Sequence, residues 1–300
     1  MFSSKNMTKL LVIGGSGLVG STILQYNPYS WDITATYNLH PQDNTNANFI
    51  KMDLLDDSNP ILNLIEKIKP NFVVHTVAYP SVDFCEEEHL LADKLHVEKT
   101  QKIAEICKKI NSKLLFLSTD AVFEGELNRK YVESDDTNPV NYYGQTKLRA
   151  EKIVLNSSKN NVVLRTAVVY GHHEKSRFTN WILDYLQQNK IVDPFVDQYN
   201  TPTLVNDLVK SIFLIFQKNI SGLFHATGPN CVNRFEFAIK LANKFNYDKS
   251  LIKPVTSKEK KQNAPRPIST CLNSKKLEQA INFQFTNLED GISLIFNKSN

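Results

Sequence analysis

The sequence predicts an α/β fold, with a doubly wound, parallel Rossmann-type sheet and a smaller C-terminal lobe. Short apolar runs alternate with helical segments through the first half of the chain, as a parallel sheet requires. A glycine-rich turn separates the first apolar run from the first helical segment. The length of 300 residues exceeds that of a typical single domain. We therefore expect one domain over residues 1–170, to which residues 200–228 return, and a lobe formed mainly by residues 171–300.

Charge and composition exclude several classes of protein. Lysine and arginine number 35 against 31 acidic residues, without a dense basic block, so we expect no nucleic-acid partner. No apolar run approaches the ~18 residues of a membrane span, and no apolar secretory segment is present. The cysteines lie far apart without a CxxC pair, which argues against a disulfide framework and a zinc site; they are Cys85, Cys107, Cys231 and Cys271. We expect a cytoplasmic protein with no membrane contact and no metal.

The first apolar run, Lys9–Ile13, is expected to be a strand, and residues 21–26 are expected to be a helix. Between them lie glycines at positions 14, 17 and 20, in the spacing GxxGxxG. Strand, glycine turn and helix form the first unit of a dinucleotide-binding fold, in which a pyrophosphate sits at the helix N-terminus. A purely structural turn is the alternative. The next strand, residues 32–37, ends without the acid that favours NAD or the arginine that holds a 2′-phosphate. NADPH is therefore slightly preferred, and NADH remains open.

Further strands are expected at residues 48–52, 72–75 and 113–117, and helices at residues 60–69 and 86–110. Asp53 follows one of these strands, where its carboxylate would accept a hydrogen bond from the adenine amino group. A helix N-cap or turn residue is the alternative at that position. Thr119 follows the strand at residues 113–117, on the ligand-binding edge of the sheet. Its hydroxyl would hydrogen-bond a substrate carbonyl there, although a lone threonine is more often only a strand terminus.

Tyr143 and Lys147 lie four residues apart on an expected helix over residues 142–156, so both side chains project from the same face. A fixed ammonium beside a phenol favours the phenolate and is expected to lower the phenol pKa from ~10. Tyr143 is then a candidate general acid or base. The alternative is a half-buried aromatic ring beside a solvated lysine, which is common on amphipathic helices.

Taken together, these motifs resemble the extended short-chain dehydrogenase/reductase superfamily and, within it, the dTDP-4-dehydrorhamnose reductase family. The resemblance runs from about Lys9 to Phe296. In the first half it is carried by GGSGLVG at 14–20, Asp53-Leu54, TVAY at 76–79, Val82-Asp83, LSTDAVFEG at 117–125 and YYGQTK at 142–147. In the second half it is carried by LRTAVVYG at 164–171, Asp197-Gln198, TPT at 201–203, FHATG at 224–228 and Arg266-Pro267.

The resemblance implies a reductase that transfers a hydride from NADPH to a nucleotide-linked 4-keto-6-deoxysugar, in biosynthesis of the dTDP-rhamnose type. It implies that the catalytic residues are Thr119, Tyr143 and Lys147. It implies that the cofactor is held by Tyr143, Lys147, Gly14, Ser16, Gly17, Leu18, Val19, Gly20, Asp53, Leu54, Ala78 and Tyr79. It implies that the nucleotide-sugar is held by Asp83, Gln198, Thr203 and Arg266. It also allows a homodimer.

The chain departs from the family pattern at five positions. Ala121 stands where these reductases usually carry tyrosine, and Val168 stands where they often carry tryptophan, so we expect a wider sugar pocket. The other departures are His96 for asparagine, Lys99 for glycine and Asn200 for glycine. A second hypothesis is a non-catalytic nucleotide-binding protein, because the regulatory subunit of methionine adenosyltransferase resembles these reductases. The intact Thr119, Tyr143 and Lys147 favour the enzyme.

Overall fold

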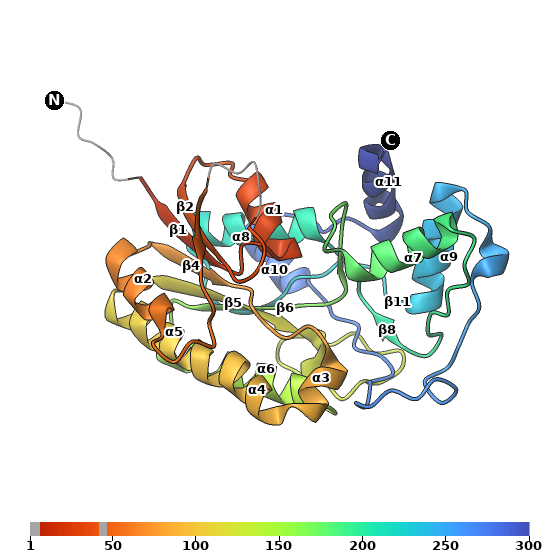
Figure 1. Cartoon of the computed structure of the whole chain (residues 1–300), viewed down its shortest axis with the longest axis horizontal. Helices are drawn as coiled ribbons and strands as arrows, with labels where there is room; N and C mark the ends of the chain where they lie inside the picture. The colour runs from red at the N-terminus through yellow and green to blue at the C-terminus, as the bar shows by residue number, and fades with distance from the viewer. Residues whose placement is uncertain (1–6, 42–46, 300) are drawn as a thin grey trace.

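A seven-stranded parallel sheet forms the centre of the protein (Figure 1). The computed structural model describes residues 7–41 and 47–299; residues 1–6 and 42–46 of the expected first domain lie outside the described residues. The strands lie in the order β10-β6-β5-β4-β1-β2-β3. After β1 the chain adds strands first on one side, as β2 and β3, and then on the other side, from β4 onward. This is the doubly wound order in which ligands bind at the carboxyl ends of the strands. The predicted fold class is confirmed.

The strands and helices of this domain follow the alternation predicted from the sequence. The strands are β1 Lys9–Ile13, β2 Asp32–Tyr37, β3 Asn48–Lys51, β4 Phe72–His75, β5 Lys113–Thr119, β6 Val162–Thr166 and β10 Gly222–His225. The helices are α1 Leu18–Gln25, α2 Pro60–Ile68, α3 Val82–Glu87, α4 His89–Asp93, α5 Lys99–Lys109, α6 Tyr142–Ser157, α8 Val205–Gln217 and α10 Lys275–Ile281. Short turns of π-helix and 3-10 helix occur at η1 Lys94–Glu98 and η2 Asp120–Val122.

Helices cover both faces of the sheet, as Figure 1 shows, and each face has its own apolar core. Successive side chains of a strand point to opposite faces. In β1, Leu10 and Val12 therefore join the core beneath α1, α8 and α10, whereas Leu11 and Ile13 join the core beneath α2, α5 and α6. The continuous apolar run that predicted β1 is explained by burial on both faces.

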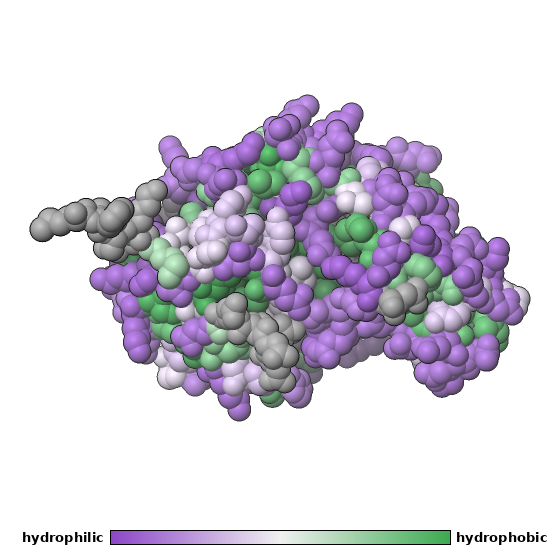
Figure 2. Space-filling view, turned by 90° about the horizontal axis from the view of Figure 1, so that it is seen from above, coloured by the Kyte–Doolittle hydropathy of each residue, from purple (hydrophilic) through white to green (hydrophobic). Residues whose placement is uncertain are grey.

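The remaining elements form a smaller C-terminal part beside the carboxyl ends of the strands (Figure 1). They are β7 Val169–Tyr170, α7 Arg177–Gln187, β8 Tyr199–Asn200, β9 Thr203–Leu204, β11 Val232–Asn233, α9 Arg234–Phe245, η3 Lys249–Leu251 and α11 Leu288–Ser299. A third core, which includes Ile182, Phe237 and Leu241, packs α7 against α9. Figure 2 shows hydrophilic residues over most of one face, with apolar residues in separate patches.

The expected helix over residues 86–110 is confirmed from His89 to Lys109, where the chain stays helical through a π-helical turn, but it is interrupted at Glu88. The chain forms α3, α4, η1 and α5 in succession. Ser81 caps α3 by accepting a hydrogen bond from the Phe84 amide, and Glu88 leaves the helical region with φ −115° and ψ 62°. The expected helix over 21–26 also begins earlier, at Leu18, so the glycine turn leads directly into α1. Within the described residues, no helix has the length and apolar character needed to cross a membrane.

The cysteine expectation is also wrong, because Cys231 and Cys271 form a disulfide with Cα atoms 5.5 Å apart. They are 40 residues apart in the sequence, and strand β8 brings them together. Val232 pairs with Asn200 in β8, while Ser269 forms a bridge to Tyr199 on the same strand. Sequence spacing carries no sign of this non-local contact. Cys85 and Cys107 are buried free thiols.

We expect Cys231→Ser to lower the free energy of unfolding of the oxidised protein. Closing a loop of 40 residues lowers the entropy of the unfolded chain, and this predicts a loss of about 4 kcal/mol. Urea unfolding of the two proteins measures the loss, and the difference should vanish when both are reduced. Titration of four free thiols in the denatured, unreduced wild type would contradict the pairing.

Candidate functional site

The glycine turn after β1 is shaped to admit an anion. Gly14 has φ +96°, and the Gly15 amide donates to the Thr36 carbonyl at 2.7 Å, which holds the turn on β2. Gly17 is the N-cap of α1 and provides no side-chain cap for the first helical amides. A Cβ on Gly20 would lie 2.1 Å from the Gly14 carbonyl oxygen, so glycine is required for α1 to pack on the turn. The uncapped amides favour a phosphate at this point.

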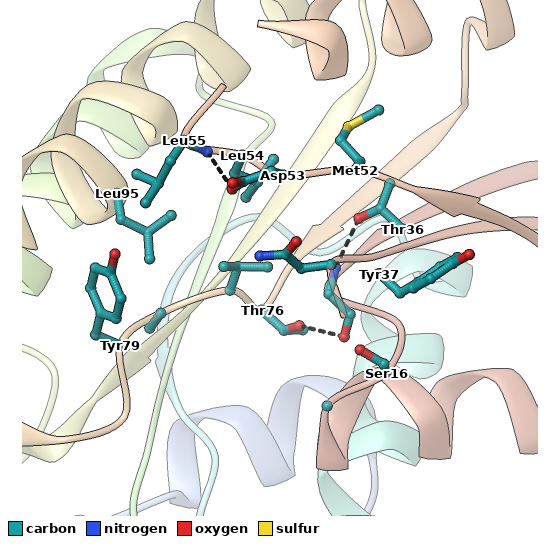
Figure 3. Close-up of a pocket in the computed structure, with 15 residues that line it drawn as sticks. Ser16, Thr36, Tyr37, Met52, Asp53, Leu54, Leu55, Thr76, Tyr79 and Leu95 are labelled. Carbon is teal, nitrogen blue, oxygen red and sulfur yellow. Dashed lines mark hydrogen bonds between the residues drawn. The ribbon is translucent and has the colours of Figure 1, made fainter. Parts of the chain in front are cut away.

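A cavity of about 330 Å³ extends from this turn across the carboxyl ends of β1, β2 and β4 (Figure 3). Of the predicted cofactor residues, it is lined by Gly14, Ser16, Gly17, Asp53, Leu54, Ala78 and Tyr79. It is also lined by Thr36, Tyr37, Asn38, Met52, Leu55, Thr76, Val77 and Leu95. Leu18, Val19 and Gly20 continue into α1 and do not line it. Its size and its largely apolar lining suit an adenosine group.

Among the described residues that line this cavity, Asp53 is the only charged one. Its Oδ1 accepts a hydrogen bond from the Leu55 amide at 2.9 Å, as the turn alternative expected (Figure 3). The same hydrogen bond orients the carboxylate in the cavity lining. The turn role of Asp53 is therefore compatible with its predicted role as an acceptor for the adenine amino group. Tyr37 and Asn38 line the cavity beside β2. They bring no negative charge to the position where NAD-specific folds carry an acid.

Helix α6 begins at an Asn141 N-cap, whose Oδ1 accepts from the Gly144 amide at 2.9 Å. Tyr143 and Lys147 lie one turn apart on the face that meets the sheet. The Lys147 side chain is buried; its Nζ donates to the Leu117 carbonyl at 2.7 Å and lies 3.9 Å from the centroid of the Phe116 ring. The alternative of a solvated lysine is therefore wrong for Lys147.

Burial dominates the ionisation of both side chains. It raises the pKa of Tyr143 above its usual value, and a hydrogen bond with the Thr119 side chain only partly offsets this effect. The expected lowering of this pKa by the Lys147 ammonium is therefore wrong: desolvation is the main cause of the shift, and the charges of Asp120 and Cys85 raise the pKa further. Burial also lowers the pKa of Lys147 from 10.5 to about 7, against the opposing charge of Glu151. At neutral pH the Tyr143 phenol carries its proton and can donate it, while Lys147 is close to the pH at which it loses its charge.

A buried ion pair holds α6 against the sheet behind Lys147. Arg165 on β6 donates from Nε and Nη2 to the two carboxylate oxygens of Glu151, at 3.0 and 2.7 Å. The side chains of the pair are 4% and 2% exposed. Ser118 on β5 donates to the same carboxylate at 2.5 Å. Strands β5 and β6 are thus both tied to the turn of helix that follows Lys147.

Thr119 ends β5 beside Tyr143 and also contacts Asp120. Its hydroxyl donates to Asp120 Oδ1 at 3.1 Å, and its oxygen accepts from the Ala121 amide at 3.1 Å. Asp120 is buried, and its other oxygen accepts from Asn200 Nδ2 at 2.6 Å and from the Thr270 hydroxyl. Burial raises the pKa of Asp120, while these hydrogen bonds oppose the rise. Asn200, one of the departures from the family pattern, thus joins the C-terminal part to the catalytic edge.

A second cavity, of about 300 Å³, lies in the C-terminal part. It is lined by Phe178, Trp181, Asp193, Pro194, Phe195, Gln198, Arg234, Lys260, Gln262 and Arg266. Gln198 and Arg266 were predicted from the sequence. Arg234 and Trp181 were missed, because neither stands in a recognisable motif. Burial lowers the pKa of Arg234 to about 10, so its guanidinium remains charged at neutral pH.

The other predicted substrate residues act differently in the structure. Asp83 does not line the second cavity; it pairs with Arg266 at 3.0 Å and accepts from the Ala264 amide at 2.9 Å. It therefore orients Arg266. Thr203 is fully buried, and its hydroxyl donates to the Ala167 carbonyl at 2.9 Å. A direct contact between Thr203 and a substrate stays a prediction.

Ala121 and Val168 line neither of these two cavities. Val168 has φ +42°, which is a strained conformation for a β-branched residue, and its carbonyl accepts from the Thr203 amide at 3.2 Å. The expected wider sugar pocket stays a prediction. Among the described residues, no group of three or more His, Cys, Asp or Glu side chains is placed to hold a metal ion.

Gly17→Val tests the anion site in the glycine turn. A Cβ at Gly17 meets only the Gly14 carbonyl oxygen at 3.5 Å, so the variant should fold, whereas its branched side chain occupies the space of a pyrophosphate. We expect NADPH affinity to fall about 100-fold or more, or about 3 kcal/mol, measured by calorimetry. Gly20→Val is the control for misfolding, because its Cβ would strike backbone. Unchanged affinity in folded Gly17→Val would exclude this turn as the site.

Lys147→Met tests the cost of burying the ammonium. The pKa of Lys147 is about 7 in the folded protein and 10.5 when the side chain is exposed. Between these pH values the folded state therefore binds fewer protons than the unfolded state. The free energy of unfolding of the wild type consequently rises with pH over this range. The variant should be more stable by a few kcal/mol at about pH 6, and this advantage should shrink at about pH 9. Urea unfolding measures both, with the exposed Lys152→Met as control. An advantage that does not change with pH would contradict the lowered pKa.

Comparison with known proteins identifies the family of this chain. The family model described as RmlD substrate binding domain matches residues 7–300. The dTDP-4-dehydrorhamnose reductase of Aggregatibacter actinomycetemcomitans is 28% identical over 291 residues, which cover 93% of this chain and 95% of that protein. Methionine adenosyltransferase 2 subunit beta of Rattus norvegicus is 30% identical over 279 residues, which cover 90% of this chain and 81% of that protein.

A solved structure shows the same fold. It is the dTDP-4-dehydrorhamnose reductase of Bacillus anthracis in complex with NADP, which has a TM-score of 0.86 and 24% identity and covers 97% of this chain and 99% of that one. The resemblance stated from the motifs is confirmed by these matches. Because the family model spans nearly the entire sequence, this chain belongs to the RmlD substrate binding domain family, with the fold of the extended short-chain dehydrogenases/reductases.

Proposed function

We propose that this protein is an NADPH-dependent reductase of a nucleotide-linked 4-keto-6-deoxysugar, in biosynthesis of the dTDP-rhamnose type. The observation that carries the proposal is the group formed by Thr119, Tyr143 and Lys147. The Thr119 hydroxyl lies close enough to the Tyr143 phenol to lower its pKa, and Lys147 is buried one turn away. This group lies at the carboxyl ends of parallel strands, next to a cavity suited to a dinucleotide. A protein that only binds nucleotides has no evident need for a buried, costly lysine.

Each residue has a defined role in the proposed reaction. When bound, the reduced nicotinamide supplies a hydride to the ketone carbon of the sugar. Tyr143 gives its phenolic proton to the ketone oxygen, which becomes a hydroxyl, and its raised pKa keeps that proton in place until then. Thr119 donates to the same oxygen once a substrate replaces its present partner. Protonated Lys147 stabilises the phenolate that remains, and it is also placed to hold the nicotinamide ribose.

The second cavity supports a nucleotide-sugar as the substrate. Arg234, Arg266 and Lys260 bring three positive side chains to its lining. Lys260 pairs with Asp193, which also lines the cavity, and Arg266 pairs with Asp83. Two guanidinium groups can hold a diphosphate through paired hydrogen bonds. Trp181 and Phe178 line the same cavity and offer rings on which a nucleotide base can stack. The roles proposed for these residues rest on their position in the lining of this cavity.

The cofactor is proposed to be NADPH, with NADH as the alternative. Tyr37 and Asn38 are the side chains at the end of β2, and neither would repel a 2′-phosphate. The same two residues offer no cation to attract it. Calorimetric Kd values for NADPH and NADH decide the preference. If the protein recognises the 2′-phosphate, we expect NADPH to bind at least about tenfold more tightly than NADH.

The direct test is oxidation of NADPH in the presence of dTDP-4-keto-6-deoxymannose, compared with other 4-keto sugars. Tyr143→Phe should bind NADPH normally but lower kcat by about 100-fold or more, because the proton donor is lost. The neighbouring Tyr142→Phe is the matched control: its hydroxyl donates to Asp93 at 2.9 Å, away from Thr119, and near wild-type turnover is expected. Undiminished turnover by Tyr143→Phe would overturn the assignment.

A non-catalytic binding protein is the second candidate, favoured by the similarity to methionine adenosyltransferase 2 subunit beta. The same assay separates the two. A wild-type protein that binds NADPH tightly but reduces no member of the 4-keto sugar panel would support the second candidate. Turnover that depends on Tyr143 would exclude it.

The assembly, location and domain limits expected from the sequence remain part of this proposal. Light scattering tests the homodimer, and limited proteolysis tests the boundary near residue 170. Cell fractionation tests the cytoplasmic location. The Cys231 disulfide bears on that test, because disulfides persist mainly in oxidising compartments.

A further inference from the structure

A buried histidine joins the cofactor cavity to the catalytic helix. His96 lies in η1, a turn of π-helix between α4 and α5, and only 1% of the residue is exposed. Such π-helical turns are uncommon and often occur at functional sites, because the extra residue re-aims a side chain. Here the turn directs the imidazole between Tyr79, on the loop after β4, and Thr146, on α6.

Two hydrogen bonds fix the chemical state of this imidazole. The Tyr79 amide donates to His96 Nε2 at 2.8 Å, so Nε2 must be unprotonated. The proton of the neutral ring therefore resides on Nδ1, which donates to the Thr146 hydroxyl oxygen at 2.8 Å. Burial lowers the pKa of His96 to about 3, with a further contribution from the Lys147 charge, so the ring is neutral at physiological pH.

The connection continues to the proposed proton donor. The Thr146 hydroxyl donates to the Tyr143 carbonyl at 2.8 Å. A chain of hydrogen bonds thus runs from the Tyr79 amide through His96 and Thr146 to the Tyr143 backbone. The His96 ring also packs edge-on against the Tyr143 ring, with centroids 5.8 Å apart and an interplanar angle of 84°. Both the backbone and the ring of Tyr143 therefore depend on His96.

We propose that His96 is a positioning residue that couples the cofactor loop at Ala78 and Tyr79 to the phenol of Tyr143. The loop lines the dinucleotide cavity, so a cofactor that orders the loop would, through His96, also order the proton donor. His96 itself contacts no reacting atom. This inference rests on the proposed function for its kinetic test, but its binding and spectroscopic tests do not.

The kinetic test is a double-mutant cycle of His96→Phe with Tyr143→Phe. Phenylalanine keeps a planar ring but removes both hydrogen bonds. We expect His96→Phe to lower kcat about tenfold or more with Tyr143 present, and to change kcat by less than about twofold in the Tyr143→Phe background. Equal losses in the two backgrounds would show that His96 does not act through Tyr143, and would overturn the proposal.

The matched control is His75→Phe. His75 ends β4, is equally buried, and has a pKa that burial also lowers to about 3. Its Nε2 hydrogen-bonds the Thr100 hydroxyl at 3.2 Å, and this contact leads to α5 and not to Tyr143. Its effect on kcat should be the same in both Tyr143 backgrounds. Coupling to Tyr143 equal to that of His96 would count against a specific role for His96.

Two measurements remain informative if the protein reduces no ketosugar. Nitrogen-15 spectra should show His96 as the Nδ1–H tautomer, and an Nε2–H tautomer would overturn the hydrogen-bond assignment. His96→Phe should weaken NADPH binding by about tenfold, because the Tyr79 loop loses its support, whereas His75→Phe should not. Circular dichroism must show both variants folded. Unchanged NADPH affinity of His96→Phe would refute the coupling even for a non-catalytic protein.

Discussion

Helix α6 carries both Tyr143 and Lys147, and a buried ion pair between Glu151 and Arg165 fixes it to the sheet. Two charges removed from water are costly unless they are paired and fully hydrogen-bonded. Here both carboxylate oxygens are used, by Arg165 and by Ser118. Loss of either partner would leave an uncompensated buried charge, at a cost of about 3–5 kcal/mol. The pair also keeps a negative charge one turn from Lys147, which opposes the effect of its burial. The Glu151 carboxylate thus both fixes the position of α6 and partly offsets the effect of burial on the Lys147 pKa.

The two cavities bind by different physical means. In the part of the chain that the structure describes, Asp53 is the only charged residue that lines the first cavity, so the helical amides after Gly17 are the groups available to a pyrophosphate there. The second has a lining that includes Arg234 and Arg266 beside aromatic rings. Between them, Asp120 accepts hydrogen bonds from Asn200 and Thr270 of the C-terminal part. Thr119 in turn donates to Asp120. These contacts join the edge of the sheet that carries Thr119 to the C-terminal part.

Much of the fold, and the placement of Tyr143 and Lys147 on one helix, was predictable because the signals are local. Strand β1 is a run buried on both faces, and Tyr143 and Lys147 meet because four residues span one helical turn. Other features depend on contacts between distant segments. The ionisation of Tyr143 differs from the expectation because the depth of burial cannot be read from helical spacing. The Cys231 disulfide and the cavity position of Arg234 likewise arise where the C-terminal part folds back along β8 and α9.

The sequence alone determined the order of strands and helices along the chain, the glycine turn and the one-turn spacing of Tyr143 and Lys147, since each depends on residues close together in the sequence. The tertiary structure decided the surroundings of those side chains. His96 is only a departure from a family motif in the sequence, yet a turn of π-helix carries it between Tyr79 and Thr146. Its contacts join three segments that are far apart in the sequence: η1, the loop after β4 and helix α6. Burial, pKa and hydrogen-bond partners are properties of that packing, because each is set by the atoms that replace water around a group.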